Sequence, residues 1–284
     1  MHEFTTIQEL RGWLAEARLV GHRVGLVPTM GALHAGHLSL VDEARLRSDV
    51  VVLTAFVNPL QFGPGEDFER YPRDLTRDAA LAREREVAVL FAPSVETMYP
   101  PGSEIRVVPG PTADCLEGAV RPGHFAGVLT IVTKLFHLVE PDVAVFGQKD
   151  IQQAILIRQL VRDLDFPLEL VIAPTVREPD GMALSSRNAY LTPEERQQGL
   201  ALSIALRAAD AAWRGGERDA GRLVGLMEQE FRRFPAVLPD YIAAVDSERL
   251  APVTTAEPGT ILTVAGRLGQ TRLLDNHVLG RKFP

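Results

Sequence analysis

Apolar runs of strand length alternate with amphipathic stretches over the first two-thirds of the chain. Runs rich in β-branched residues, which are typical of buried strands, lie at residues 24–29, 50–57, 87–93, 142–147 and 168–176. Helical spacing of apolar residues is found at residues 36–48, 76–87, 126–141 and 151–164. This alternation predicts a parallel sheet covered on both faces, which is a doubly wound, Rossmann-like α/β fold. Ligands of such folds lie beyond the carboxyl ends of the strands.

The pattern changes after the segment REPDGMALSSRNAYLTPEE, residues 177–195. Helical stretches follow at residues 193–216 and 217–234, and strand-like runs follow at residues 239–246, 260–268 and 271–276. The turn residues Pro179, Asp180 and Gly181 are typical of a connection between domains. We therefore expect a Rossmann-like domain over residues 1–180 and a smaller α+β domain over residues 181–284.

Composition narrows the class of protein and its partners. The chain has 284 residues, 46% of them hydrophobic, and a net charge of −7, so it lacks the basic surface typical of nucleic-acid binding. A single cysteine, Cys115, cannot form an internal disulfide. The first residues lack the pattern of a signal peptide, and no apolar run approaches the roughly 20 residues that span a bilayer. We expect a cytoplasmic protein that acts on small molecules, without nucleic-acid or membrane partners.

The segment TMGALHAGH, residues 29–37, lies between a predicted strand and a predicted helix. Unpaired amides and the positive end of the helix dipole favour an anion at such a corner. Gly31 and Gly36 allow the backbone to approach a ligand closely. The imidazoles of His34 and His37 can donate hydrogen bonds to phosphate oxygens and stabilise charge on a departing oxygen. The corner therefore predicts a nucleotide-phosphate site.

Other interpretations of the histidines remain open on these residues alone. The H-x-x-H spacing is compatible with zinc, but no third ligand with the usual spacing follows. Alternatively, His34 caps the helix and His37 is exposed. For His124, in the turn-rich RPGHF, a structural role is the simpler prediction.

Polar side chains also follow other predicted strands. Gln61, in NPLQFG, can present its amide to a small polar substrate, although a solvent-facing loop glutamine is the simpler interpretation. In FGQKDIQQ, Lys149 can reach a phosphate, Asp150 can cap the helix and Gln153 lies one turn on; a capped helix with a surface lysine is the alternative. The segment LSSRNAYL adds hydroxyls and a guanidinium suited to phosphate oxygens, from Ser185, Ser186 and Arg187.

The segments PTMGALHAGH, NPLQFG, GQKDIQQ and LSSRNAYL, in this order and spacing, resemble the pantoate–β-alanine ligase family. HAGH alone is similar to the H-x-G-H signature of the wider nucleotidyltransferase group, so the combination is the more specific signal. The resemblance implies ATP-dependent ligation of (R)-pantoate with β-alanine to give pantothenate, AMP and pyrophosphate through pantoyl adenylate. It also implies Mg²⁺ with ATP, a homodimer, nucleotide and pantoate binding by residues 1–180, and a lid formed by residues 181–284.

The resemblance also implies roles for individual residues. His37, His34 and Lys149 are the expected catalytic residues, with His37 as proton donor. Gln61 is expected to bind pantoate and β-alanine, and Gln153 to bind pantoate. No residue is expected to bind a metal directly. The positions that correspond to the family's ATP site are Met30, Gly31, Ala32, Leu33, His34, Ala35, Gly36, His37, Gly147, Gln148, Lys149, Asp150, Val176, Leu184, Ser185, Ser186 and Arg187.

Two other functions are weighed against the ligase. An adenylyltransferase would move AMP onto a phosphate ester, but the uncharged Gln61 and Gln153 suit a phosphorylated acceptor poorly. A non-catalytic ATP sensor would use the nucleotide for domain closure, but it would not need both histidines and Lys149. The sequence therefore favours the ligase.

Overall fold

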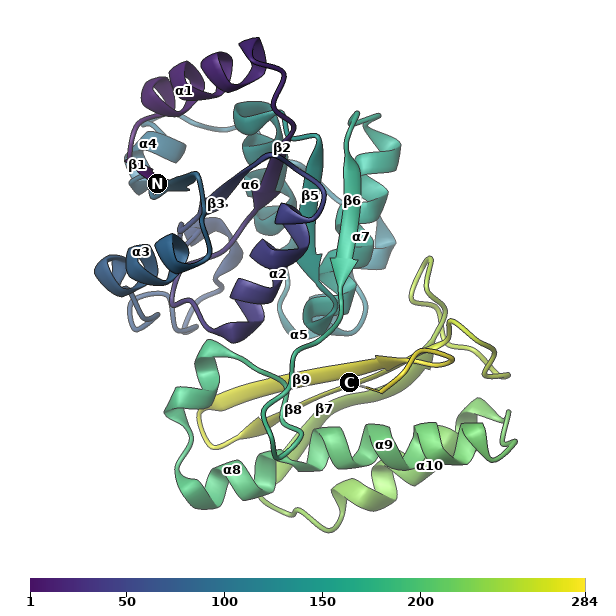
Figure 1. Cartoon of the computed structure of the whole chain (residues 1–284). Helices are drawn as coiled ribbons and strands as arrows, with labels where there is room; N and C mark the ends of the chain where they lie inside the picture. Colours follow the sequence, from purple (N-terminus) through teal and green to yellow (C-terminus); the bar gives the residue numbers. More distant parts are fainter. Residues whose placement is uncertain (284) are drawn as a thin grey trace. The chain divides into compact units, whose positions relative to one another are not determined.

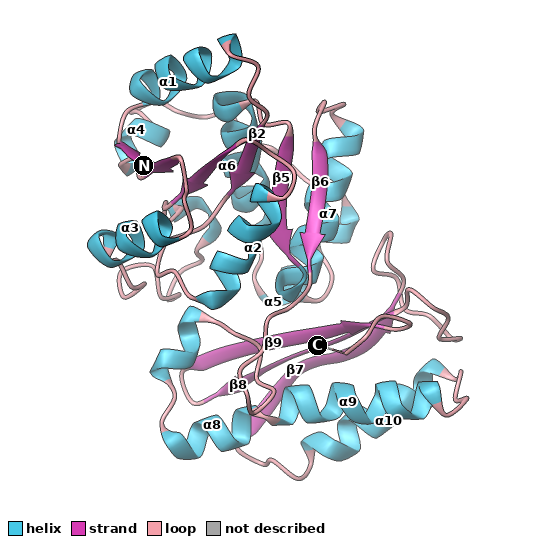
Figure 2. Cartoon of the chain, viewed as in Figure 1, coloured by secondary structure: helices cyan, strands magenta, loops and turns pink. Residues whose placement is uncertain are grey.

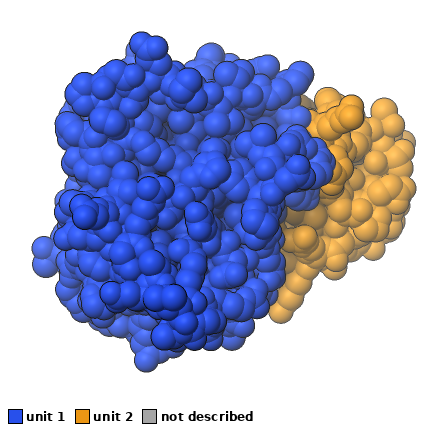
Figure 3. Space-filling model, turned by 90° about the horizontal axis from the view of Figure 1, so that it is seen from above, with its two compact units in different colours: residues 1–147, 156–173 blue, residues 148–155, 174–284 orange. Residues whose placement is uncertain are grey.

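The computed structural model describes residues 1–283, which form two compact units. The first unit comprises Met1–Gly147 and Leu156–Ala173. The second unit comprises Gln148–Ile155 and the described residues from Pro174 onward (Figure 3). Within residues 1–283, no helix is both long and apolar enough to cross a membrane. The assignment of separate functions to residues 1–180 and 181–284 stays a prediction.

The first unit is built on a six-stranded parallel sheet with the order β1-β4-β3-β2-β5-β6 (Figure 1). The strands are β1 (His2–Phe4), β2 (Val24–Val27), β3 (Val50–Thr54), β4 (Val89–Phe91), β5 (Val143–Gly147) and β6 (Glu169–Ala173). All of their pairings are parallel. Chain order reverses at β2, which pairs with β3 on one side and β5 on the other. The carboxyl ends of β2 and β5 therefore flank the switch point at which such sheets bind ligands.

Helices cover both faces of this sheet, as the alternating pattern predicts. On one face, α1 (Ile7–Leu19) and α6 (His124–Val139) contribute to a core that also includes Leu156 and Ile157 of α7 (Ile151–Asp163). On the other face, α2 (Ala35–Arg45) and α3 (Leu75–Glu84) form a separate buried cluster. The predicted doubly wound α/β architecture is confirmed.

The second unit is an antiparallel sheet with helices on one face (Figure 2). Its strands β7 (Val237–Val245), β8 (Ile261–Leu268) and β9 (Thr271–Val278) pair in sequence order. Leu206 of α9 (Ala201–Arg214) and Leu223 of α10 (Ala220–Phe231) are fully buried in the cluster that includes Leu262 and Val264 of β8. This arrangement confirms the predicted smaller α+β region.

One predicted helix needs correction, and two elements near the N-terminus were not predicted. The stretch 193–216, which was predicted as one helical stretch, forms two helices: α8 (Pro193–Gly199) and α9 (Ala201–Arg214). A Cβ at Gly199 would lie 2.9 Å from the Met182 Cε atom, so glycine permits the close packing there. Neither β1 nor α1 was predicted, although Thr6 and Glu9 form a capping box at the start of α1.

The connections contain short helices. These are α4 (Val95–Met98), α5 (Glu117–Val120), η1 (Pro59–Gln61), η2 (Pro111–Ala113), η3 (Gln148–Asp150) and η4 (Ser186–Tyr190). Three of them, η1, η3 and η4, contain residues predicted for the site.

Candidate active site

The loop between β2 and α2 has a tightly defined backbone. Gly31 and Ala32 both adopt left-handed conformations, with φ of 80° and 51°. Alanine in this region costs about 1 kcal/mol, so the surrounding structure must hold the loop in place. The Thr29 hydroxyl accepts a hydrogen bond from the Gly31 amide at 3.1 Å.

Asp78 of α3 provides the main support for this loop. Its carboxylate accepts hydrogen bonds from the amides of Ala32, at 2.9 Å, and Leu33, at 2.7 Å. Burial raises the pKa of Asp78, whereas these two amide hydrogen bonds oppose the rise. Asp78 was not among the predicted site residues. Its signal is a carboxylate in the same helix as the buried Ala79 and Ala82.

The two predicted histidines lie together at the start of α2. His34 is the N-cap residue, and its Nδ1 atom accepts a hydrogen bond from the Gly36 amide at 3.1 Å. The neutral ring of His34 therefore carries its hydrogen on Nε2. The rings of His34 and His37 stack with centroids 4.0 Å apart. The capping interpretation of His34 is right, whereas His37 is half-buried rather than exposed.

Gln61 is buried at the end of η1, which excludes the interpretation as a solvent-facing loop residue. Its Nε2 atom lies 3.0 Å from the Met30 Sδ atom, so the structure brings two predicted site residues together. Its Oε1 atom accepts a hydrogen bond from Asn58 Nδ2 at 3.0 Å. The helix α6 packs closely here, because a Cβ at Gly127 would overlap the Leu60 carbonyl.

His124 and Arg121 hold the backbone of Gln61. His124 Nδ1 donates to the Gln61 carbonyl at 2.7 Å, and Arg121 Nη2 donates to the same oxygen at 3.3 Å. Arg121 also pairs with Glu66 and lies 3.0 Å from His124 Nε2. Burial, with a smaller effect of Arg121, lowers the pKa of His124 to about 4, so the ring is neutral. The structural role predicted for His124 is thus supported by its contacts.

In the second unit, Lys149 is fixed by its backbone. The Nδ2 atom of Asn276, a buried residue of β9, donates to the carbonyls of Gln148 at 2.9 Å and Lys149 at 2.8 Å. The Lys149 side chain is only 21% exposed, and its Nζ atom lies 3.4 Å from Asp150. Asn276 was not among the predicted site residues; its signal in the sequence is a run of polar residues, DNH, between Leu274 and Val278.

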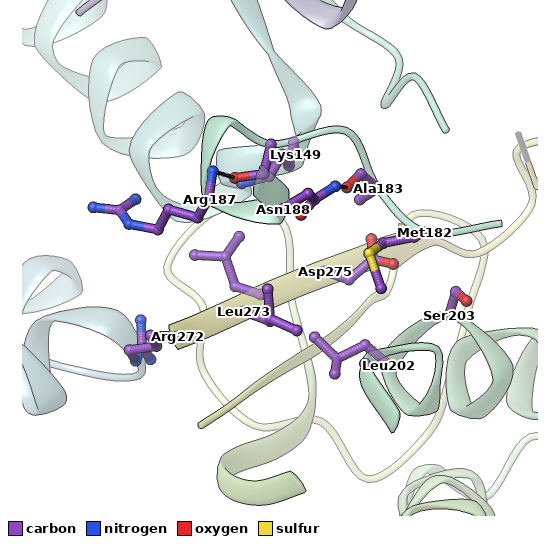
Figure 4. A pocket seen from close by; sticks show the side chains of 13 residues that line it. Lys149, Met182, Ala183, Arg187, Asn188, Leu202, Ser203, Arg272, Leu273 and Asp275 are labelled. Carbon is purple, nitrogen blue, oxygen red and sulfur yellow. Dashed lines mark hydrogen bonds between the residues drawn. The ribbon is translucent and has the colours of Figure 1, made fainter. Parts of the chain in front are cut away.

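Lys149, Ser185 and Arg187 line the same pocket of the second unit (Figure 4). The pocket walls also include Asn188 of η4, Leu202 and Ser203 of α9, and residues 272–275 of β9. Ser185 caps η4 by accepting a hydrogen bond from the Arg187 amide at 3.3 Å. A lysine, a guanidinium and a hydroxyl around one pocket are suited to phosphate oxygens.

Four further predicted residues are Gly147, Gln153, Val176 and Leu184. Gly147 is the last residue of β5, and Gln153 is half-buried in the first turn of α7. The Leu184 amide donates to the Val176 carbonyl at 3.0 Å, which joins these two positions of the second unit. Gln153 does not line the pocket that contains Lys149. Among residues 1–283, no group of three or more His, Cys, Asp or Glu side chains could hold a metal ion.

Comparisons with known proteins agree on one family. The family model described as Pantoate-beta-alanine ligase matches residues 2–278. The chain is 50% identical to the pantothenate synthetase of Moorella thermoacetica, over 98% of this chain and 99% of that protein. It is also 50% identical to the pantothenate synthetase of Thermotoga neapolitana, over 99% of this chain and 100% of that protein.

Solved structures of the same family are similar over the whole chain. The crystal structure of pantothenate synthetase from Thermus thermophilus matches with a TM-score of 0.93 and 50% identity, over 98% of this chain and 99% of that one. The pantoate–β-alanine ligase from Francisella tularensis, complexed with β,γ ATP and β-alanine, matches with a TM-score of 0.83 and 32% identity. That match covers 100% of both chains.

Proposed function

The chain belongs to the pantoate–β-alanine ligase family, and from that premise we propose how its residues carry out the reaction. The protein is an enzyme that uses ATP to join pantoate to β-alanine. The family match over nearly the full chain carries this conclusion, and it does not favour an adenylyltransferase or a non-catalytic ATP sensor.

We propose that the reaction has two steps. The pantoate carboxylate attacks the α-phosphorus of ATP, and the bond to pyrophosphate breaks. The amine of β-alanine then attacks the acyl carbon of pantoyl adenylate, loses a proton and expels AMP. Adenylation supplies the leaving group that a carboxylate lacks, so a covalent enzyme intermediate is unnecessary. The enzyme mainly has to orient the reactants and neutralise charge on the phosphates.

His34 and His37 are the proposed phosphate-binding residues of the first unit. The support is their place at the N-terminal end of α2, where helix amides and dipole favour an anion. The cap leaves Nε2 as the hydrogen-bearing nitrogen of neutral His34, which suits donation to a phosphate oxygen. His37 would stabilise the negative charge on the departing pyrophosphate and donate a proton to it. Residues 30–37 would contact the nucleotide through their backbone.

Lys149, Ser185, Ser186 and Arg187 are the proposed pyrophosphate-binding residues. The pocket that Lys149, Ser185 and Arg187 line supports this role, because two positively charged residues belong to the walls of one cavity. The segment 147–150 and the backbone of Val176 and Leu184 complete the proposed ATP site. The other two substrates are pantoate and β-alanine. Gln61 would bind both of them, and Gln153 would bind pantoate. The ligase from Francisella tularensis is complexed with β-alanine, which supports a β-alanine site in this protein.

Mg²⁺ is proposed to arrive with ATP. Such an ion would be held mainly by phosphate oxygens and water. When bound, it would neutralise phosphate charge, and Lys149 and Arg187 would add to that effect.

We further propose that residues 181–284 act as a lid over the adenylate formed on residues 1–180. We also propose that the enzyme is a homodimer and that it works in the cytoplasm.

Isotope exchange tests the proposed first step. Radiolabelled pyrophosphate should exchange into ATP when the purified enzyme is given pantoate and Mg²⁺, without β-alanine. Omission of pantoate should abolish the exchange. Exchange that needs β-alanine, or none in protein that binds ATP, would contradict a separate adenylation step.

A further inference from the structure

We propose that Asn58, whose amide is held by two backbone groups and by the Tyr99 hydroxyl, fixes the orientation of the Gln61 side-chain amide, so that Gln61 offers the acid substrate hydrogen-bond donors only. The inference rests on the proposed role of Gln61 in pantoate binding. Tyr99 follows α4, Asn58 caps η1, and Gln61 ends η1. Tyr99 is thus a positioning residue that acts from outside the set predicted from the sequence.

The orientation of the Asn58 amide follows from two backbone partners. The Nδ2 atom lies 3.1 Å from the Gly127 carbonyl oxygen, which can only accept a hydrogen bond. The Oδ1 atom lies 3.3 Å from the Leu60 amide, which can only donate one. The reversed amide would place two acceptors together and two donors together. Asn58 therefore has one favourable orientation.

This orientation determines that of Gln61. Asn58 Nδ2 has a second hydrogen, and the Gln61 amide atom 3.0 Å away must accept it. That atom is Oε1, which places Nε2 at the other side of the amide group. The protein neighbour of Nε2 is the thioether of Met30, a weak acceptor that does not use the donor capacity of an amide nitrogen.

Tyr99 adds a further hydrogen bond that stabilises this orientation of Asn58. Its hydroxyl lies 2.9 Å from Asn58 Oδ1, closer than the Leu60 amide, and it must donate because Oδ1 can only accept. The ring of Tyr99 is half-buried, with the Lys134 ammonium 5.4 Å from its centroid and the Phe56 ring 6.1 Å away. Burial raises the pKa of Tyr99, which keeps the hydroxyl protonated as a donor.

The fixed orientation suits an acid substrate. Carboxylate oxygens have lone pairs and no hydrogen, so they bind the Nε2 end of an amide and are repelled by the oxygen end. A freely rotating glutamine would present either end. An amide that is locked before binding lowers the cost of ordering, and thereby strengthens substrate binding.

A double-mutant cycle on the full-length enzyme tests this relay, with Tyr99→Phe, Gln61→Ala and the double variant. Tyr99→Phe should raise the pantoate KM about tenfold, as loss of one buried hydrogen bond predicts, while the ATP KM changes by less than about twofold. In the Gln61→Ala background, Tyr99→Phe should have no further effect on the pantoate KM. Tyr241→Phe, which removes a hydroxyl from β7 of the second unit, is the matched control and should keep the wild-type pantoate KM.

The outcomes separate the relay from the proposed function. An unchanged pantoate KM in Tyr99→Phe, or an equal rise in both backgrounds, overturns the relay and leaves the role of Gln61 intact. An unchanged pantoate KM in Gln61→Ala refutes the role of Gln61 and the relay with it. Asn58→Asp gives an independent readout, because the new oxygen repels Gln61 Oε1 and favours the reversed amide. It should raise the pantoate KM more than Tyr99→Phe does, and an equal rise in the ATP KM would indicate a purely structural role.

Discussion

The imidazole rings of His34 and His37 stack with centroids 4.0 Å apart and planes 25° from parallel. His34 is held by its cap on α2, because its Nδ1 atom accepts from the Gly36 amide. The fixed ring of His34 gives His37 a defined position at the N-terminal end of the same helix. A single local motif thus provides both the anion-binding amides and the orientation of the proposed proton donor.

Replacement of His37 by alanine tests that assignment. His37→Ala should slow pyrophosphate exchange by about 10²–10³-fold, because it removes a donor that stabilises the departing charge. The melting temperature should remain close to that of the wild type, since the side chain is not part of the core. The exposed His22 provides the matched control, and His22→Ala should exchange at the wild-type rate. Near-normal exchange in His37→Ala would remove this residue from the mechanism.

Lys149 is predicted to act through its charge. Lys149→Ala should slow pyrophosphate exchange by about 10²-fold or more, as expected for loss of a cation that binds phosphate in a partly buried pocket. Lys149→Arg should recover part of the rate, whereas the exposed Lys282 should tolerate alanine without loss. Equal exchange rates in Lys149→Ala and the wild type would contradict the proposed pyrophosphate site.

Gln153 is predicted to discriminate between the two substrates of the first step. Gln153→Ala should raise the pantoate KM by about tenfold or more through loss of hydrogen bonds to the acid, with little change in the ATP KM. Steady-state kinetics with each substrate varied in turn measure both values. A rise in the ATP KM alone would place Gln153 at the nucleotide instead.

His124 predicts a pH dependence of stability. The pKa is about 4 in the fold, below the ordinary value of 6.5, so the neutral ring contributes stability above pH 6.5. That contribution, at most about 3 kcal/mol, should be lost as the pH falls from 6.5 to 4. Urea unfolding across this range measures it against His124→Gln, which keeps an acceptor for Arg121 and a donor for the Gln61 carbonyl. Parallel pH profiles for the two proteins would refute the assignment.

Local patterns in the sequence are sufficient to predict the fold class, but they predict the ends of individual helices less well. The alternation of strands and helices predicts the parallel sheet, because strands buried on both faces are apolar throughout. The break between α8 and α9, at Leu200, is not visible in the periodicity of the sequence; Gly199, the residue before it, packs closely against Met182 and Leu273. Propensity favours helix on both sides of that break, and tertiary contacts determine where it falls.

The residues of the candidate site likewise fall into those that the sequence predicts and those that it does not. The histidines and Lys149 are found from the sequence because each lies in a short motif between a strand and a helix. The sequence does not predict roles for Asp78, Asn58 and Tyr99, because those roles depend on residues far away in the sequence. The Tyr99 hydroxyl, for example, donates to Asn58. For Asp78, the sequence shows only an acidic residue on the same helix face as Ala79 and Ala82. That pattern does not identify the groups to which the carboxylate binds.

Oxygen-18 transfer tests the proposed two-step mechanism most directly. The enzyme is given ATP, β-alanine and pantoate labelled with oxygen-18 in its carboxylate, and the products are analysed by mass spectrometry. Attack of the carboxylate on the α-phosphorus predicts that an oxygen-18 atom appears in AMP and none in pyrophosphate. Label in pyrophosphate or inorganic phosphate, or unlabelled AMP, would contradict pantoyl adenylate as the intermediate.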